Sequence, residues 1–278
     1  MPGVIDASGI SGSLDAKNIV MGVLQKGVEL SNLVSICKQI QVPELTANIP
    51  VSAAPSVDED LLEYESSEIQ TGAFTDIAFS LLKDRIKLAV SDEATYKSKA
   101  GDPLSIQIEA AGMQLANILD KKIVAALMTT PQTHAGTDWG TATNNPFVEM
   151  GLAVSKILPY KADYVIMNPT NYSEYLGSDT LESAITTVPA AFNGAIGKVP
   201  GLNLDIFVSS HATLGTAIVG SSTGFSAVVG NGPVKVRTWD DENTGTRIYQ
   251  MDVWRQVKAP IFLTAGSLNQ SVCTMTGL

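Results

Sequence analysis

"DPLSIQIEAAGMQLANILDKKIVAALM" (residues 102–128) predicts one long helix around which the other elements can be arranged. Aspartate caps a first helical turn well, and proline fits the first helical position. Apolar residues then recur at spacings close to three and four, which places them on one helix face: Leu104, Ile108, Ala111, Leu115, Leu119 and Leu127. At ~1.5 Å per residue such a helix is roughly 35–40 Å long. We expect it to form the spine of an elongated domain.

Two shorter helices downstream begin with similar capping chemistry, at Asn145-Pro146 and Asn168-Pro169. The apolar run "ADYVIM" (residues 162–167) lies between them and is rich in strand formers. We therefore expect a short buried strand that turns directly into a helix at Asn168, and a further helix near residues 180–187. The helix that starts at Pro146 should turn five apolar residues inward: Phe147, Met150, Val154, Ile157 and Leu158.

The clearest strand signal lies near the C-terminus. "VKVRTW" (residues 234–239) and "RIYQMDVWRQV" (residues 247–257) flank the turn sequence "DDENTGT". In the second arm, Tyr249, Met251 and Val253 alternate with polar residues and share one face. This pattern predicts a long two-stranded ribbon. Two further strands are expected, in "GAIGKVPGLNLDIFVSS" (residues 194–210) after a Gly/Pro turn and in "TAIVG" (residues 216–220).

Residues 45–90 predict an extended hairpin. A proline-punctuated strand leads into an acidic stretch without a basic residue, and the return arm gathers Lys83, Arg85 and Lys87. A hairpin of this length is not stable alone in water and needs another surface to lie on. We expect its acidic tip and basic base to pair between subunits. The acidic residues of the stretch are Asp58, Glu59, Asp60, Glu63, Glu65 and Glu68.

Composition sets further limits. The 278 residues are 45% hydrophobic, which is enough for a substantial core, and the net charge is −10. A protein this acidic is poorly suited to reading nucleic-acid sequence, although it can still enclose DNA. Neither a signal peptide nor an eighteen-residue apolar run is apparent, so we expect a protein made in the cytoplasm without a membrane partner. Cys37 and Cys273 are expected to be free thiols.

No sequence motif supports catalysis, a metal or a cofactor. Gly220 to Gly224 fits the G-x-S-x-G pattern with Ser222 at its centre, but a nucleophile elbow needs a helix after the serine and a later histidine. Both histidines, His134 and His211, precede it. A Gly/Ser turn between strands is the simpler interpretation. The acidic stretch lacks the ligand spacing and central glycine of a calcium loop, and no phosphate-binding glycine motif is present.

Taken in order, these elements resemble the major capsid proteins of tailed bacteriophages and related archaeal viruses, with the Hong Kong 97-type fold that encapsulins share. "NIPVSAAPSVDEDLLEYES" and "FTDIAFSLLKDRIKLAVSDEATYKS" resemble the two arms of that family's extended loop. The helix over residues 102–128 resembles its spine helix. "ADYVIMNPTNYSEYL" is similar to the strand, turn and helix of its axial domain.

The resemblance implies an α+β chain with seven segments. They are an N-terminal arm (1–30), the start of a peripheral domain (31–46), an extended loop (47–90), the peripheral domain with its spine (91–147), an axial domain (148–232), a peripheral ribbon (233–260) and a return to the axial domain (261–278).

The resemblance also implies partners and a location. Copies of the chain would form the hexamers and pentamers of an icosahedral shell that encloses double-stranded DNA without sequence-specific binding. Scaffold, portal and decoration proteins are further partners, and the protein would reside in the virion. No crosslinking residues are carried over from the family.

Three alternatives remain open from the sequence. The first is an encapsulin shell that stores an enzyme, which the length also suits. The second is a hydrolase that uses Ser222 and occurs as a monomer or small oligomer. The third is an adhesive or tail-tube protein, which would form fibres or tubes rather than closed shells.

Overall fold

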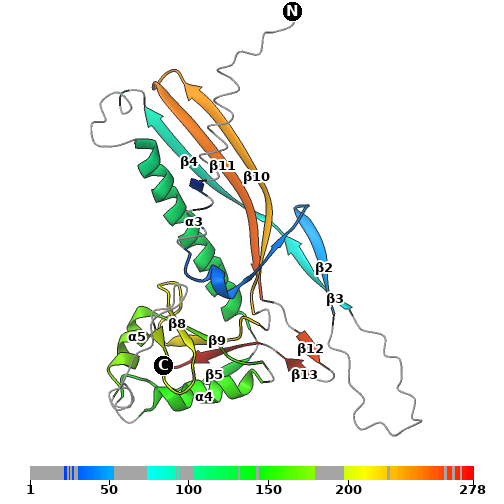
Figure 1. The fold of residues 1–278 in the computed structure, drawn as a ribbon, viewed down its shortest axis with the longest axis vertical. Coiled ribbons are helices and arrows are strands. Elements are labelled where there is room, and N and C mark those ends of the chain that lie inside the picture. Colours follow the sequence, from blue (N-terminus) through cyan, green and yellow to red (C-terminus); the bar gives the residue numbers. More distant parts are fainter. Residues whose placement is uncertain are drawn as a thin grey trace, which may run out of the picture.

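The computed structural model shows an elongated α+β molecule in which one long helix reaches from a four-stranded sheet to a six-stranded sheet (Figure 1). The description below concerns the part of the chain whose placement is defined. That part comprises residues 22, 23, 25, 27, 31–52, 74–91, 93, 103–130, 132–141, 144–158, 160–178, 197–223, 226–259, 262–264, 267–269 and 271–278.

The four-stranded sheet contains the ribbon that the sequence predicted. Its strands, in spatial order, are β1 (Lys38–Gln41), β10 (Val228–Asp241), β11 (Thr246–Lys258) and β4 (Leu82–Ser91). β10 and β11 pair antiparallel up to Asp241 and Thr246, which confirms the ribbon and its turn. β4 pairs antiparallel with the other edge of β11, and β1 runs parallel to β10.

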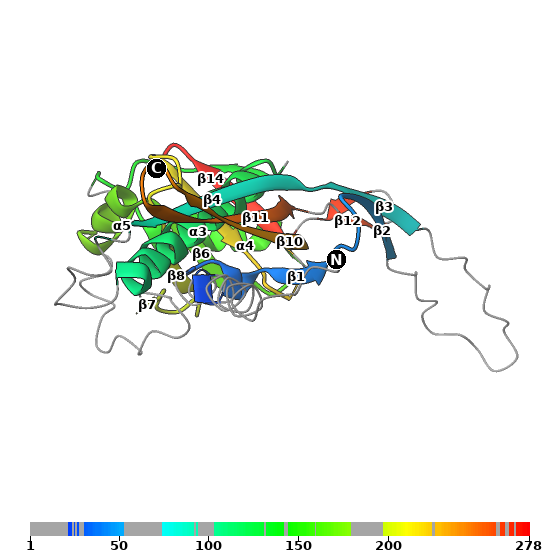
Figure 2. The ribbon, with the colours of Figure 1, turned by 90° about the horizontal axis from the view of Figure 1, so that it is seen from above.

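The two faces of this sheet differ. Val236, Met251 and Val253 pack toward the long helix α3 (Pro103–Met128) in one hydrophobic cluster. Because side chains alternate along a strand, their neighbours in sequence point to the opposite face. We call this opposite face of β4, β10 and β11 the helix-free face. In Figure 2 the three strands lie on one side of α3, and among the described residues no helix lies against their far side.

The extended hairpin is shorter than the sequence predicted. β2 (Thr46–Ser52) pairs with β3 (Phe74–Ser80) as expected, but β4 pairs with β11 instead of continuing the hairpin. Leu81 marks the change of partner and is buried against Phe79, at the root of the hairpin. The apolar residues shift from odd positions before Leu81 to even positions after it, but alternation alone does not show which strand lies beside the return arm.

The six-stranded sheet forms the second half of the molecule. Its strands, in spatial order, are β5 (Thr133–Ala135), β14 (Val272–Thr276), β9 (Thr216–Gly220), β6 (Tyr164–Met167), β8 (Asp205–Val208) and β7 (Gly197–Lys198). All four residues of β6 are buried, as the run "ADYVIM" predicted. Tyr164 and Ile166 face one hydrophobic cluster, whereas Val165 and Met167 face another. Both faces of this sheet are therefore covered.

Two capped helices cover one face of the six-stranded sheet. α4 (Pro146–Lys156) starts at Asn145, whose side chain accepts a hydrogen bond from the Phe147 amide, and α5 (Pro169–Leu176) starts at Asn168 in the same way. Both predicted helix starts are confirmed. Leu158 lies beyond the end of α4 and is 61% exposed, so its predicted inward position was wrong.

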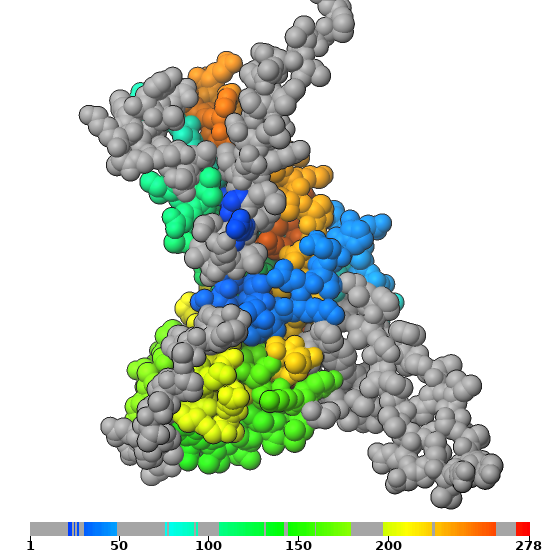
Figure 3. All heavy atoms as spheres, in the orientation of Figure 1, coloured from blue at the N-terminus to red at the C-terminus, as the bar shows by residue number. Residues whose placement is uncertain are grey.

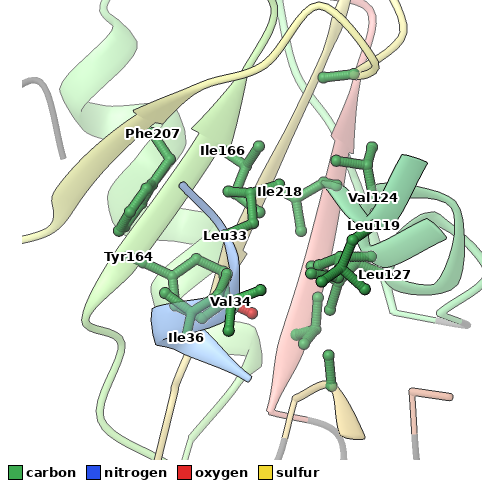
Figure 4. Packing of buried hydrophobic residues seen from close by; sticks show 14 of the residues in the cluster. Leu33, Val34, Ile36, Leu119, Val124, Leu127, Tyr164, Ile166, Phe207 and Ile218 are labelled. Atoms are coloured by element: carbon green, nitrogen blue, oxygen red, sulfur yellow. The ribbon is translucent and has the colours of Figure 1, made fainter. Parts of the chain in front are cut away.

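α3 joins the two sheets through a divided apolar stripe, and its bounds confirm the predicted spine helix. Ala111 and Leu115 pack against the four-stranded sheet, while Leu119, Ile123 and Leu127 pack against the six-stranded one. The second cluster also receives Leu33, Val34 and Ile36 from the short 3-10 helix region at residues 33–36, as Figure 4 shows. In Figure 3 this part of the chain, drawn in blue, crosses the middle of the molecule.

Two further short strands pair with each other. β12 (Phe262–Thr264) and β13 (Ser267–Asn269) form a small hairpin. The helix expected at residues 180–187 and most of the N-terminal arm lie outside the described residues. The seven predicted segment boundaries stay a prediction.

Candidate assembly surfaces

The β2–β3 hairpin extends away from the rest of the molecule (Figures 1 and 2). Within the described residues it pairs with no third strand. Its hydrophobic anchor lies at its root, where Phe79 and Leu81 pack with Val42 and Val228. There the Ser80 amide also donates a hydrogen bond of 2.6 Å to the Gln256 side chain. Two strands with so little core of their own need a further surface, which in a subunit assembly is another copy.

The six acidic residues predicted to make inter-subunit contacts, Asp58 to Glu68, lie outside the described residues. The sequence places them between Ser52 and Phe74, the paired residues that end the hairpin farthest from its root. Their role stays a prediction.

The three basic residues of that prediction, Lys83, Arg85 and Lys87, alternate along β4 on the helix-free face, and all three are exposed. Arg85 donates hydrogen bonds of 2.6 and 3.2 Å to the carboxylate of Asp252 on β11. The Lys87 ammonium lies 5.9 Å from the centre of the Trp239 ring. The structure thus brings the three together on one open surface, and it gives Arg85 a partner within its own chain.

Arg85 and Asp252 form an ion pair on this face. The hydrogen bonds from Arg85 hold the pKa of Asp252 below its usual value, although burial of the carboxyl acts in the opposite direction. The Asp252 side chain is 3% exposed, whereas that of Arg85 is 41% exposed. The carboxylate is therefore covered, and the guanidinium lies at the surface.

Sequence reasoning missed four residues of the same face: Lys235, Arg237, Trp239 and Trp254. The Lys235 ammonium lies 5.7 Å from the centre of the Trp254 ring, a cation–π contact like that of Lys87 with Trp239. The alternation in "VKVRTW" was a usable signal, since it places lysine, arginine and tryptophan on one side of a strand. What the sequence did not show was that β4 pairs with the other edge of β11, which brings these side chains and those of β4 onto one surface.

An ion pair ties the opposite face of the sheet to α3. The Lys122 ammonium lies 2.6 Å from the carboxylate of Asp84 on β4. Both side chains are mostly covered, since 26% of Lys122 and 18% of Asp84 is exposed. This pair helps to fix the helix on one face of the sheet and leaves the other face open.

Ser222 does not have the surroundings of a hydrolase nucleophile. Its hydroxyl and its backbone amide both donate to the carboxylate of Asp163, the amide at 2.8 Å. His134 bonds to Glu149, and His211 bonds to Asn117. Among the residues described after Ser222, the next regular element is strand β10 rather than a helix. The G-x-S-x-G match is thus a turn closed by an aspartate.

A cavity of about 230 Å³ lies beside the C-terminal end of α5. Its described lining includes Trp139, Asn144 and Glu174, and neither Ser222 nor a histidine lines it. No group of three or more metal-ligating side chains occurs among the residues that the structure describes. In the same part of the chain, no helix combines the length and apolar character needed to cross a membrane. Cys37 and Cys273 are free thiols, as predicted.

Several solved structures share this fold. A virus-like particle protein from Pyrococcus furiosus matches with a TM-score of 0.63 and 10% identity, over 93% of this chain and 98% of that one. A chain of Microbacterium phage Oxtober96 matches with a TM-score of 0.66 and 11% identity, over 89% and 91%. The holo encapsulin complex of Synechococcus elongatus matches with a TM-score of 0.60 and 11% identity, over 88% and 86%. At these identities the likeness establishes the fold, which is the Hong Kong 97-type capsid fold.

The family is established by sequence. A family model described as phage capsid protein matches residues 79–260, from the return arm of the hairpin to the end of the ribbon. The chain therefore belongs to the phage capsid protein family, and it is a structural protein of viral shells. No curated protein matches the sequence.

Proposed function

We propose that this protein is the major capsid subunit of a tailed virus and assembles into the hexamers and pentamers of an icosahedral shell around double-stranded DNA. The family match over residues 79–260 carries the proposal. The open sheet face and the projecting hairpin support it, because each leaves surface that a single chain does not cover.

The encapsulin reading is the second candidate, and the structural likeness to the Synechococcus elongatus encapsulin complex supports it. A viral capsid and an encapsulin both form a closed shell, and they differ in what the shell contains. The match to the phage capsid family favours the viral one. Particles purified from the native source should contain DNA if the protein is a viral capsid subunit, and an enzyme if it is an encapsulin.

Further parts of the proposal follow from the viral reading. The subunit is made in the host cytoplasm and resides in the virion. Scaffold, portal and decoration proteins are its partners, and it encloses DNA without reading its sequence. It needs no cofactor and carries out no catalysis, in keeping with the hydrogen bonds that engage Ser222. A Ser222→Ala substitution should accordingly leave assembly intact.

The first experiment is light scattering on a size-exclusion column, followed by negative-stain electron microscopy of the purified protein. We expect closed particles of megadalton mass. If the chain stays monomeric or dimeric, the measurement is repeated with a scaffold protein present, and failure there as well would overturn the proposal. Tubes or fibres would instead support a tail-tube or adhesive protein, and a small oligomer would justify a hydrolase assay of Ser222→Ala.

A further inference from the structure

The cavity at the C-terminal end of α5 is large enough for a small molecule. Its volume is about 230 Å³, and it is bounded by the turn at residues 139–141 and by Glu174, Gly177 and Ser178 at the end of the helix. At ~30 Å³ per water molecule, this space corresponds to about seven waters. A short aliphatic molecule with one polar end fits in it.

The side-chain donors of the polar groups around this cavity are already used within the chain. The Asn144 amide group donates to the Asp138 carbonyl at 2.7 Å, and the Thr141 hydroxyl donates to the Asp138 carboxylate at 3.4 Å. The Ser178 hydroxyl donates to the Tyr175 carbonyl at 2.8 Å. Amide and hydroxyl oxygens still have lone pairs that can accept hydrogen bonds. The lining therefore favours a ligand that donates hydrogen bonds.

The charge of the lining is negative. Glu174 is half-buried, and its carboxylate has no hydrogen bond or ion pair to any residue that the structure describes. The described lining contains no basic side chain. The last carbonyls of α5 add the partial negative charge of a helix C-terminus. A carboxylate in a partly closed cavity attracts a cation more strongly than one in open solvent, because less water and salt screen it.

An indole ring forms part of the wall. Trp139 is buried, and its ring centre lies 6.3 Å from that of Tyr175 on α5. The Tyr175 ring lies 5.7 Å from that of Phe147 on α4, so aromatic side chains of two helices support the indole. An aromatic ring attracts an ammonium group and packs well against an aliphatic stem. The wall therefore suits an organic cation.

An anion is the competing ligand, because one donor at this site is not engaged. The Trp139 indole N–H is buried and has no hydrogen-bond partner among the described residues, so it would suit an acceptor. The Glu174 carboxylate disfavours an anion, since like charges repel and the described lining offers no basic side chain to offset it. A metal ion is also disfavoured, because Glu174 is the single carboxylate in that lining.

We propose that this cavity binds the ammonium group of a small aliphatic amine, with the Glu174 carboxylate as its partner. The aliphatic stem packs against the Trp139 ring, and the side-chain oxygens of Asn144 and Ser178 accept further hydrogen bonds from the ammonium. Binding of an amine at this site does not depend on whether the chain forms shells.

Calorimetric titration of the full-length protein with butylammonium tests the site. Butanol and butyrate are matched ligands of similar length, one neutral and one negative. We expect one butylammonium to bind per chain with a Kd between about micromolar and millimolar, since so few atoms make limited contact. Both matched ligands should bind at least about tenfold more weakly, because neither brings a positive charge to Glu174.

Fluorescence shows whether the amine binds in this cavity. The chain has three tryptophans, and Trp239→Phe with Trp254→Phe leaves Trp139 as the only one. Butylammonium should then change the emission of Trp139 with the same midpoint as the calorimetric titration, because the ligand contacts the ring. Measurable binding with unchanged emission would place the amine elsewhere and overturn the proposal.

Substitutions of Glu174 test its role directly. Glu174→Gln removes the charge but keeps the shape of the side chain, and should weaken butylammonium binding about tenfold or more. Glu174→Asp keeps the charge and should retain more of the affinity than Glu174→Gln. The matched control, Glu109→Gln, removes an exposed carboxylate on α3 and should leave the Kd within about twofold of the wild type.

Circular dichroism and the thermal midpoint show whether each variant still folds. If Glu174→Gln does not fold, the comparison of butylammonium with butanol on the wild-type protein still decides whether the cavity recognises a positive charge.

Each other result overturns the proposal. Equal affinity for butanol would show that the cavity does not recognise charge. Stronger binding of butyrate would assign the cavity to anions through the Trp139 indole N–H. Unchanged affinity in Glu174→Gln would exclude that carboxylate as the partner. Absence of saturable binding would exclude an amine site, and loss of shells in Glu174→Gln would then assign this position to a contact between copies. A wild-type chain that binds butylammonium but forms no shells contradicts only the proposed shell function.

Discussion

The two sheets of this protein differ in how their faces are covered. In the six-stranded sheet, β6 has every residue buried, and clusters on both faces come from the same chain. In the four-stranded sheet, the exposed residues of β4 alternate with covered ones, and within the described part of the chain only one face receives a helix. The first sheet is covered on both faces within one chain, whereas the second is covered by α3 on one face and carries exposed charged side chains on the other.

This difference predicts separate roles for the six-stranded and the four-stranded half of the molecule. A sheet covered on both faces owes its stability to apolar burial within the subunit. A sheet covered on one face keeps a charged surface available for recognition. Substitutions in the first half should therefore change folding, while substitutions on the open face of the second half should change assembly.

The largest expected effect comes from matched isoleucine substitutions in the two sheets. Ile218 in β9 is completely buried, so Ile218→Ala should lower the free energy of unfolding by about 2–5 kcal/mol. Ile248 lies on the helix-free face of β11 and is half-buried, so Ile248→Ala should cost less than about 1 kcal/mol. Urea denaturation of the dissociated subunit measures both. Equal losses would contradict the comparison of the two sheets.

A smaller effect, on the pH dependence of stability, is expected for Asp252. Because Arg85 lowers its pKa in the folded state, the unfolded chain binds more protons as the pH falls below about 4, where an unperturbed aspartate titrates. The stability that this carboxylate contributes is present at neutral pH and is lost as the pH falls through its folded pKa. Urea midpoints between pH 7 and pH 3 should therefore fall less steeply for Asp252→Asn than for the wild type.

The control for that experiment is Asp205→Asn, in the six-stranded sheet. Asp205 also contacts a basic side chain, Lys198, but at 3.4 Å. The urea midpoints of this variant over the same pH range show how much of any change comes from replacing an aspartate in general. Parallel pH dependences for the wild type and Asp252→Asn would show that Arg85 does not stabilise the charged carboxyl.

The smallest effect is expected at the tip of the ribbon. Arg247 and Asp240 form an ion pair of 2.7 Å there, with 54% and 61% of their side chains exposed. Solvent and salt screen such a pair. Asp240→Asn should leave the denaturation midpoint unchanged within error, and a clear drop would show that the ribbon tip is more tightly coupled to the core than its exposure indicates.

Much of the fold could be read from local patterns. The bounds of α3, the asparagine caps of α4 and α5 and the turn between β10 and β11 depend on residues close together in sequence, so the sequence predicted them. The partner of β4 could not be read in this way. Alternation shows which side chains share a face of a strand but not which strand lies beside it.

The residues of the helix-free face were likewise predicted only in part. The sequence alone determined that Lys83, Arg85 and Lys87 lie on one side of a strand, and that an acidic stretch precedes them. Only the tertiary structure placed Lys235 and Arg237 on the same face, more than 140 residues further along, and turned Asp252 beneath Arg85. The physical reason is the sequence separation between the residues that interact. Helix caps and strand alternation are set by neighbouring residues, whereas pairing between distant strands is decided by which faces the whole chain can bury.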